Sequence, residues 1–156
     1  MPGIIRRFAG AAAVLATVAG GLTFAAAGPA SASGWGCSGS EVSGSPYTLA
    51  SGGSVYSYAH LFYDSSTGRN CAVNVKVGRF SGVASYTDVE LDECAEDTPG
   101  TCTPLTKDQD WKTTYQYYAG PVSVPGRGHC VRLSAETDDS IGEWYATYDS
   151  GGGFHC

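Results

Sequence analysis

Six cysteines are the strongest constraint on how this chain of 156 residues folds. An even number of cysteines in a small exported protein predicts three disulfides. No Cys-x-x-Cys pair occurs, so we expect neither a metal site nor another cofactor. The six residues are Cys37, Cys71, Cys94, Cys102, Cys130 and Cys156.

Six cysteines allow fifteen pairings, of which one pair stands out. Cys94 and Cys102 bracket a turn-rich loop with Pro99 and Gly100 at its tip. A bridge there stabilises the fold by about 2–3 kcal/mol through loop-closure entropy. Short loops are easier to close, which favours Cys37–Cys71 with Cys130–Cys156, while a nested pairing stays open.

The first 32 residues have the pattern of a secretory signal peptide. Arg6 and Arg7 precede an Ala-, Val-, Leu- and Gly-rich stretch, and the small residues Ala30-Ser31-Ala32 follow it. Cleavage there leaves a single secreted β domain, residues 33–156, and we expect an extracellular location. The general and twin-arginine export routes both stay open.

The charge balance narrows the range of partners. Removing Arg6 and Arg7 takes the formal net charge from −6 to −8. An acidic protein with scattered basic residues does not fit a nucleic-acid partner. After cleavage no apolar run is long enough to span a bilayer, so we expect no membrane partner either.

Alternating apolar and polar residues predict strands throughout the mature chain. In residues 71–77, Val73 and Val75 share one face while Asn74 and Lys76 take the other, which is typical of a half-buried strand. No helical periodicity occurs beyond the signal, so the predicted fold is all-β, a small disulfide-braced antiparallel β-sandwich or barrel. The expected strands are 55–63, 71–77, 86–92, 111–118, 122–124, 129–135 and 143–148.

Three segments together carry a resemblance to a known family. They are residues 61–73, the run Tyr118-Ala119-Gly120-Pro121-Val122 and the tail Phe154-His155-Cys156, with Cys37 near the mature N-terminus and Cys130 after a Gly-rich turn. The layout resembles the small exported actinobacterial proteins called spore-associated protein A-like. The resemblance implies a secreted, disulfide-bonded β-protein on spores or aerial structures. It offers no catalytic residues to carry over.

One short motif is shared with serine proteases. Asp149-Ser150-Gly151-Gly152 matches the sequence around the nucleophile of chymotrypsin-like enzymes, and His60 is a candidate base. The mature chain is too short for the two barrels of that fold, so we expect a flexible Gly-rich tail and no catalytic residue here. His129 and His155 are expected to be structural or surface residues.

Carboxylates at alternate positions suggest a second kind of chemistry. Asp88, Glu90 and Asp92 lie about 7 Å apart along one strand face, a spacing that suits an acid/base pair in glycoside hydrolysis. On an open face nothing raises a pKa, so we expect a solvated surface.

Two further acidic pairs are candidate calcium ligands. These are Asp108 with Asp110 and Asp138 with Asp139. No EF-hand spacing accompanies them, and we expect them to form turns instead, with no bound metal.

The surplus of aromatic residues is the clearest functional signal. A two-layer protein buries one face of each sheet, so rings on both faces of a strand leave some exposed to stack on a sugar or anchor a partner. The alternative is cross-strand pairing that stabilises the sheet. The candidate binding aromatics are Tyr56, Tyr58, Phe62, Tyr115, Tyr117 and Trp144.

These observations lead to three functional hypotheses. The first is a secreted, non-enzymatic protein of the cell or spore surface that acts by binding or coating, with a surface glycan or protein as partner. The second is a small exported hydrolase that uses the carboxylates or His60. The third is an inhibitor of secreted proteases that presents the loop of residues 94–102.

Overall fold

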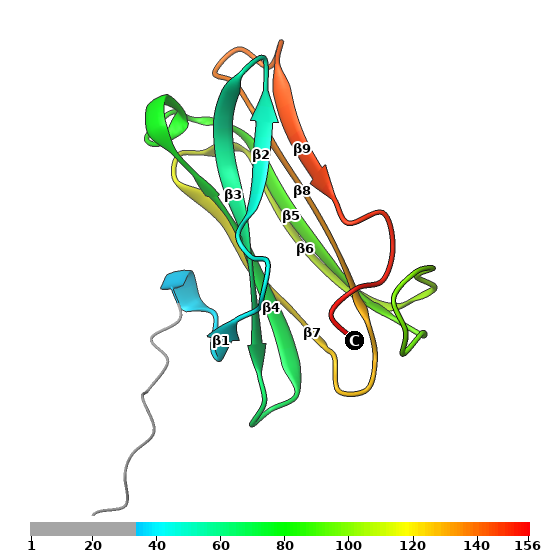
Figure 1. Ribbon diagram of the computed structural model, residues 1–156. Coiled ribbons are helices and arrows are strands. Elements are labelled where there is room, and N and C mark those ends of the chain that lie inside the picture. The colour runs from blue at the N-terminus through cyan, green and yellow to red at the C-terminus, as the bar shows by residue number, and fades with distance from the viewer. Residues whose placement is uncertain (1–33) are drawn as a thin grey trace, which may run out of the picture. The chain divides into compact units, whose positions relative to one another are not determined.

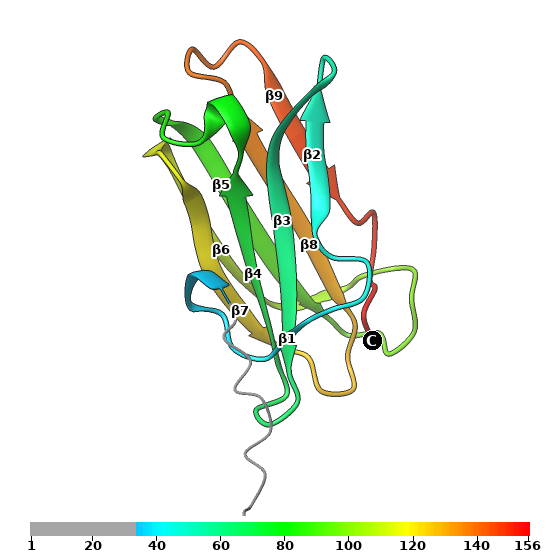
Figure 2. The same ribbon diagram turned by 60° about the vertical axis from the view of Figure 1, so that its left-hand side comes forward.

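The computed structural model describes residues 34–156, and the predicted signal peptide lies outside them. The described chain forms two antiparallel sheets joined by turns, which confirms the all-β prediction. The sheets lie face to face as two layers, so the sandwich is the correct alternative (Figure 1 and Figure 2). In this part of the chain no helix is long and apolar enough to cross a membrane.

The first layer, sheet A, is built mainly from the N-terminal half. It contains β1 (Ser40–Glu41), β2 (Tyr47–Ser51), β3 (Ser54–Asp64), β4 (Arg69–Lys76) and β7 (Tyr118–Pro125). The strand order is β1-β3-β4-β7, and β2 also pairs with β3. A short 3-10 turn, η1 (Gly34–Gly36), precedes β1. The predicted strands of residues 55–63 and 71–77 correspond to β3 and β4, which pair antiparallel.

The second layer, sheet B, contains β5 (Ser85–Cys94), β6 (Pro104–Tyr115), β8 (Val131–Asp138) and β9 (Tyr145–Asp149). Its order is β6-β5-β8-β9. A second 3-10 turn, η2 (Gly78–Phe80), connects β4 to β5 and so links the two layers. The chain returns to sheet A through the turn between β6 and β7.

The core lies between the two sheets. Alternate residues of β8 and of β5 up to Leu91 are buried, as the sequence pattern predicts, because side chains alternate across a strand. From Leu91 to Cys94 every residue of β5 is buried. Burying one large aliphatic side chain contributes about 1.5–3 kcal/mol. The largest apolar residues that are almost fully buried are Leu49, Leu61, Val73, Val89, Leu91, Val122, Val124, Val131 and Leu133.

β4 corrects the prediction of a half-buried strand. Asn74 and Lys76 are buried, with 0% and 3% of their surface exposed, and they point toward the other sheet. Val73 lies on the opposite face and packs with Phe62, Cys37 and Cys71, so that face is buried as well. The polar residues face inward because both find buried oxygen acceptors there.

β6 and β7 differ from the predicted strand of residues 111–118. β6 begins at Pro104 and ends at Tyr115, and β7 begins at Tyr118. The chain turns where the buried amine of Lys76 donates a hydrogen bond of 3.1 Å to the carbonyl of Tyr115. The strand β2 was not predicted.

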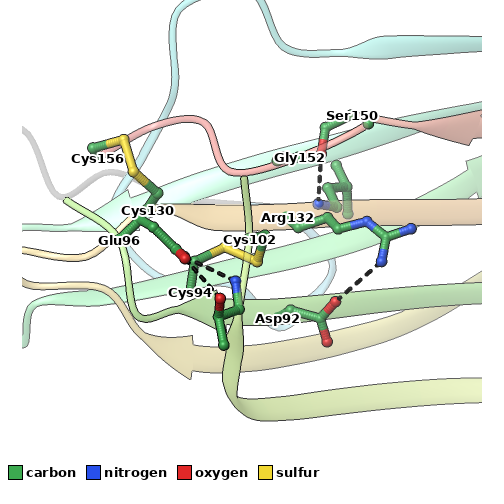
Figure 3. Close-up of a disulfide and its surroundings, with 12 residues drawn as sticks. Asp92, Cys94, Glu96, Cys102, Cys130, Arg132, Ser150, Gly152 and Cys156 are labelled. Carbon is green, nitrogen blue, oxygen red and sulfur yellow. Dashed lines mark hydrogen bonds and ion pairs between the residues drawn. A yellow bond between two sulfur atoms is a disulfide. The ribbon is translucent and has the colours of Figure 1, made fainter. Parts of the chain in front are cut away.

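The three disulfides join Cys37 to Cys71, Cys94 to Cys102, and Cys130 to Cys156. This is the pairing that short loops favour, and the nested alternative is wrong. Figure 3 shows that the last two bridges lie close together, where the carbonyl of Cys130 accepts a hydrogen bond of 2.8 Å from the amide of Cys94.

Candidate binding site

Several turns gather at the end of the sandwich that lies opposite these two bridges. The β2–β3 turn, η2 and the β8–β9 loop occupy the same end of the molecule (Figure 2). The β6–β7 turn joins them, since the amide of Gly82 donates a hydrogen bond of 2.8 Å to the carbonyl of Gln116. Residues that are far apart in the sequence therefore meet here.

An open cavity of about 530 Å³, which we call the end cavity, lies among three of these turns. This volume is within the range of small-molecule sites, about 300–1,000 Å³. The lining combines aromatic rings with hydroxyl groups and two charged side chains. Its residues are Ser51, Gly52, Ser54, Tyr56, Arg79, Phe80, Val83, Asp139, Ser140 and Trp144.

Aromatic rings and one cation form the first wall. The rings of Tyr56 and Phe80 stack with their centroids 3.9 Å apart. The guanidinium of Arg79 lies 4.8 Å from the centroid of Phe80, a cation–π arrangement, and donates a hydrogen bond of 3.2 Å to Ser54 Oγ. The stacked rings hold a planar charged group at the cavity.

The β8–β9 loop supplies the opposite wall. Asp139 Oδ1 accepts hydrogen bonds from the amides of Ile141 and Glu143, at 3.1 and 3.2 Å, and the Asp139 amide donates to the carbonyl of Trp144 at 2.8 Å. These contacts close the loop and leave Trp144 64% exposed. An ordered loop with an exposed indole loses little conformational entropy when a ligand binds.

Lys76 joins the segment after η2 to the β6–β7 turn by hydrogen bonds. Its Nζ donates to the carbonyl of Val83 at 2.7 Å and to Ser85 Oγ at 2.6 Å, in addition to Tyr115. Burial lowers the pKa of this amine, and the charge of Asp138 opposes that effect. All three donors of the ammonium are thus used to hold the base of the turns.

The structure separates the six candidate binding aromatics. Tyr56 and Trp144 both line the end cavity. Tyr115 and Tyr117 lie at a shallower hollow of about 410 Å³ around the β6–β7 turn. Phe62 is 5% exposed, packs beside the Cys37–Cys71 bridge and does not line the end cavity, so its role in binding stays a prediction. Tyr58 is half-buried on β3.

Sequence reasoning missed Arg79 and Phe80 as members of this site. They lie in a three-residue turn that shows no strand alternation, so no periodic signal marks them. The neighbouring Arg79 and Phe80 are residue types that often occur in binding sites, but their position beside Tyr56 depends on the tertiary structure.

The carboxylates of β5 do not lie on an open surface as expected. Asp92 is 3% exposed, 3.9 Å from Arg132, and Glu90 pairs with Lys107 at 2.9 Å. Burial raises the pKa of Asp92 and of Asp88, which accepts a hydrogen bond of 3.3 Å from Gln109. The assumption that nothing raises a pKa on this face is therefore wrong.

The residues of the protease-like motif have structural partners. Ser150 Oγ donates to the carbonyl of Gly152 at 2.8 Å and accepts from the amide of Leu133 at 3.2 Å (Figure 3). His60 lies on sheet A, where Nδ1 is 2.7 Å from Glu41 Oε1 and the ring is 4.7 Å from that of Trp35. Ser150 and His60 thus bind different groups on different sheets.

The other two histidines lie near the disulfide end. The Nε2 of His155 is 3.0 Å from the hydroxyl of Tyr47, and burial lowers the pKa of His155. The Nδ1 of His129 is buried without a hydrogen-bond partner among the described residues.

The Gly-rich segment after β9 is not the flexible tail that the sequence suggested. Gly100 and Gly153 exchange two backbone hydrogen bonds, of 2.9 and 2.7 Å. A Cβ on Gly152 would lie 1.9 Å from the carbonyl oxygen of Gly100. Glycine is needed there because the tail packs against the loop of residues 94–102.

That loop is also held at its base. The carboxylate of Glu96 accepts hydrogen bonds from the amide and the hydroxyl of Thr103, at 2.8 and 2.7 Å (Figure 3). The backbone of Gly100 is already paired, whereas a substrate-like inhibitor offers its backbone to the protease. The inhibitor hypothesis stays a prediction, to be tested by incubating the protein with secreted proteases.

Three of the four candidate calcium ligands, Asp108, Asp110 and Asp139, accept hydrogen bonds from backbone amides. Asp108 Oδ2 accepts from the amide of Ser123 at 2.8 Å, and Asp110 Oδ2 accepts from the amide of Gly120 at 2.7 Å. Both amides belong to β7, the edge of sheet A. Within residues 34–156, no group of three or more His, Cys, Asp or Glu side chains is arranged to hold a metal ion.

Together these features define a disulfide-bonded, all-β protein with an aromatic cavity at one end of a two-layer sandwich. Comparison with protein-family models, with curated proteins and with solved structures found no match. The resemblance to the spore-associated protein A-like family therefore stays a prediction.

Proposed function

We propose that this protein is a secreted, non-enzymatic binding protein of the cell or spore surface, and that the end cavity is its binding site. The observation that supports this most is the convergence of Tyr56, Phe80 and Trp144 around one open cavity. Tyr56 and Phe80 are 4% and 6% exposed and form a wall of the cavity, whereas Trp144 is 64% exposed. The indole of Trp144 is therefore the ring available to stack on a sugar, which has apolar faces and a polar rim. The three disulfides fit an oxidising extracellular location.

Two matched tryptophan variants test this proposal. Trp144, at the cavity, and Trp111, on β6, are 64% and 55% exposed. The mature, disulfide-intact protein is applied to a glycan array and used to capture cell-surface material. We expect Trp144→Ala to weaken binding about tenfold or more, as for an anchoring aromatic residue, and Trp111→Ala to bind like the unmodified protein. Equal loss in both variants would place binding elsewhere.

A small exported hydrolase is the second candidate. Asp88 and Glu136 are cross-strand partners on sheet B, and burial raises the pKa of both carboxyls. A raised carboxyl pKa is what a general acid requires near neutral pH. Hydrolysis of chromogenic glycosides that is lost in Glu136→Gln or His60→Ala, with no binding on the array, would overturn the binding proposal.

A further inference from the structure

The cavity carries one positive charge that no carboxylate neutralises. Among residues 34–156, Lys107, Arg132 and His60 form the ion pairs within 4.0 Å, and Arg79 is in none of them. Its polar contact is the hydroxyl of Ser54. The stack on Phe80 orients the guanidinium without cancelling its charge.

The acidic side chain in the lining, Asp139, forms no ion pair with this cation within 4.0 Å. Asp139 Oδ1 already accepts two backbone hydrogen bonds from its own loop. Its charge is thus partly satisfied by the amides of Ile141 and Glu143. The guanidinium of Arg79 and the hydroxyl groups of Ser51, Ser54 and Ser140 are among the groups of the lining that can donate hydrogen bonds to an anion.

We propose that the end cavity binds a saccharide that carries a carboxylate, such as a hexuronic acid unit of an acidic polysaccharide. This inference rests on the proposed binding function and names its ligand class. Arg79 pairs with the carboxylate through two parallel N–H···O bonds, a geometry that the planar guanidinium favours. The indole of Trp144 stacks on the apolar face of the sugar ring, and Ser51, Ser54 and Ser140 face its hydroxyl groups.

The overall charge of the protein favours a monoanion over a phosphate. The chain carries a formal net charge of −6, and the loop that bears Trp144 contains Asp139 and Glu143. A dianion is repelled about twice as strongly as a carboxylate by these charges. One arginine compensates one negative charge, so a single carboxylate per sugar matches the cavity.

Galacturonic acid oligomers and their methyl esters are matched probes, because esterification removes the charge and keeps the sugar. Isothermal titration calorimetry with the mature, disulfide-intact protein measures both. We expect the acid to bind about tenfold to a hundredfold more tightly than the ester, and this preference to shrink with added salt. Sugar phosphates form a third arm.

Variants at two arginines locate the charge effect. Arg79→Gln is expected to abolish the preference for the acid while leaving weak binding of the ester. Arg127→Gln is the matched control, since Arg127 is exposed and donates to the carbonyl of Ser65 at the β3–β4 turn. Thermal melting confirms that both variants fold.

The outcomes separate the two proposals. Equal affinity for acid and ester that still depends on Trp144 overturns the carboxylate assignment and leaves the binding function standing. Tighter binding of the sugar phosphate than of the acid also overturns it. If neither uronic probe binds while captured surface material still depends on Trp144, the ligand class is wrong. If Trp144→Ala changes nothing in any arm, the binding function itself fails.

Discussion

Substitution of Asn74 tests whether a polar side chain inside the sandwich joins the two sheets. Its Nδ2 lies within hydrogen-bond distance of three acceptors, the carbonyls of Asp88 and Glu136, at 2.9 and 3.0 Å, and Thr137 Oγ1 at 3.0 Å, and shares two N–H donors among them. Each hydrogen bond contributes about 0.5–1.5 kcal/mol net, so two donors give about 1–3 kcal/mol. We expect Asn74→Ala to destabilise the fold by this amount.

Asn74→Asp is the sharper variant, because it keeps the shape and replaces the donor with an acceptor. The new carboxylate would face three oxygen atoms at hydrogen-bond distance in a fully buried position. Burial and lost donors raise the pKa of this carboxyl, and each unit of increase costs about 1.4 kcal/mol at neutral pH. We therefore expect Asn74→Asp to be less stable than Asn74→Ala at pH 7.

The pH dependence has a definite sign. A folded pKa above the unfolded value means that the folded state binds the proton more readily, so stability rises as pH falls through the folded pKa. Urea unfolding of the disulfide-intact variants, followed by far-ultraviolet circular dichroism at pH 7 and pH 5, measures this. If Asn74→Asp matches Asn74→Ala at pH 7 and shows no recovery at pH 5, Asn74 does not join the sheets by donation.

Three more perturbations probe particular contacts. Glu136→Gln removes a half-buried carboxyl whose pKa is raised by desolvation and by neighbouring carboxylates. We expect about 0.5 kcal/mol more stability at pH 7 and a smaller gain near pH 4, because protonation of the native carboxyl removes the unfavourable charge; thermal melts at both pH values check this. Asp108→Ala with Asp110→Ala frees two amides of the β7 edge, so sedimentation should detect self-association. Gly152→Ala should cost about 1–3 kcal/mol in urea unfolding, whereas Gly34→Ala, in open space, should cost nothing measurable.

The strands that alternate cleanly could be predicted from the sequence, and those that do not were missed. β8 and β5 up to Leu91 bury alternate residues, and the pattern reports that directly. β2 is only five residues long, and the first half of β6 is exposed on both faces, so neither has an apolar side to reveal it. The turn at Gln116 lacks Gly and Pro, so local propensity could not mark it.

The direction of a strand face is a separate question that alternation cannot answer. In β4 the valine face is covered by the N-terminal arm, and the face with Asn74 and Lys76 points into the sandwich. Alternation in the sequence separates the two faces of a strand, but it does not show which element packs against each face. Inward placement depends on carbonyl and hydroxyl acceptors, which lie 14 to 63 residues away for Asn74 and 7 to 39 residues away for Lys76, and only the tertiary structure brings them to these side chains.

The site was predictable in kind but not in membership. Tyr56 and Trp144 were among the expected binding aromatics and both line the end cavity, where Trp144 is exposed and Tyr56 is buried. Arg79 and Phe80 lie in η2, and the segment that follows η2 is held to the β6–β7 turn by Lys76, which donates to the carbonyls of Val83 and Tyr115. No residue spacing in the sequence predicts that these segments lie side by side.

The two ends of the sandwich are stabilised by different means, and this bears on function. Cys94–Cys102 and Cys130–Cys156 fix the end where the tail packs on the loop, and Cys37–Cys71 joins the N-terminal arm to β4. At the cavity end, the turns are held instead by hydrogen bonds that Lys76 donates and that Asp139 accepts. Residues that line the cavity are thus free of the covalent framework. Their side chains can change and alter the ligand while the disulfide-bonded layers continue to specify the fold.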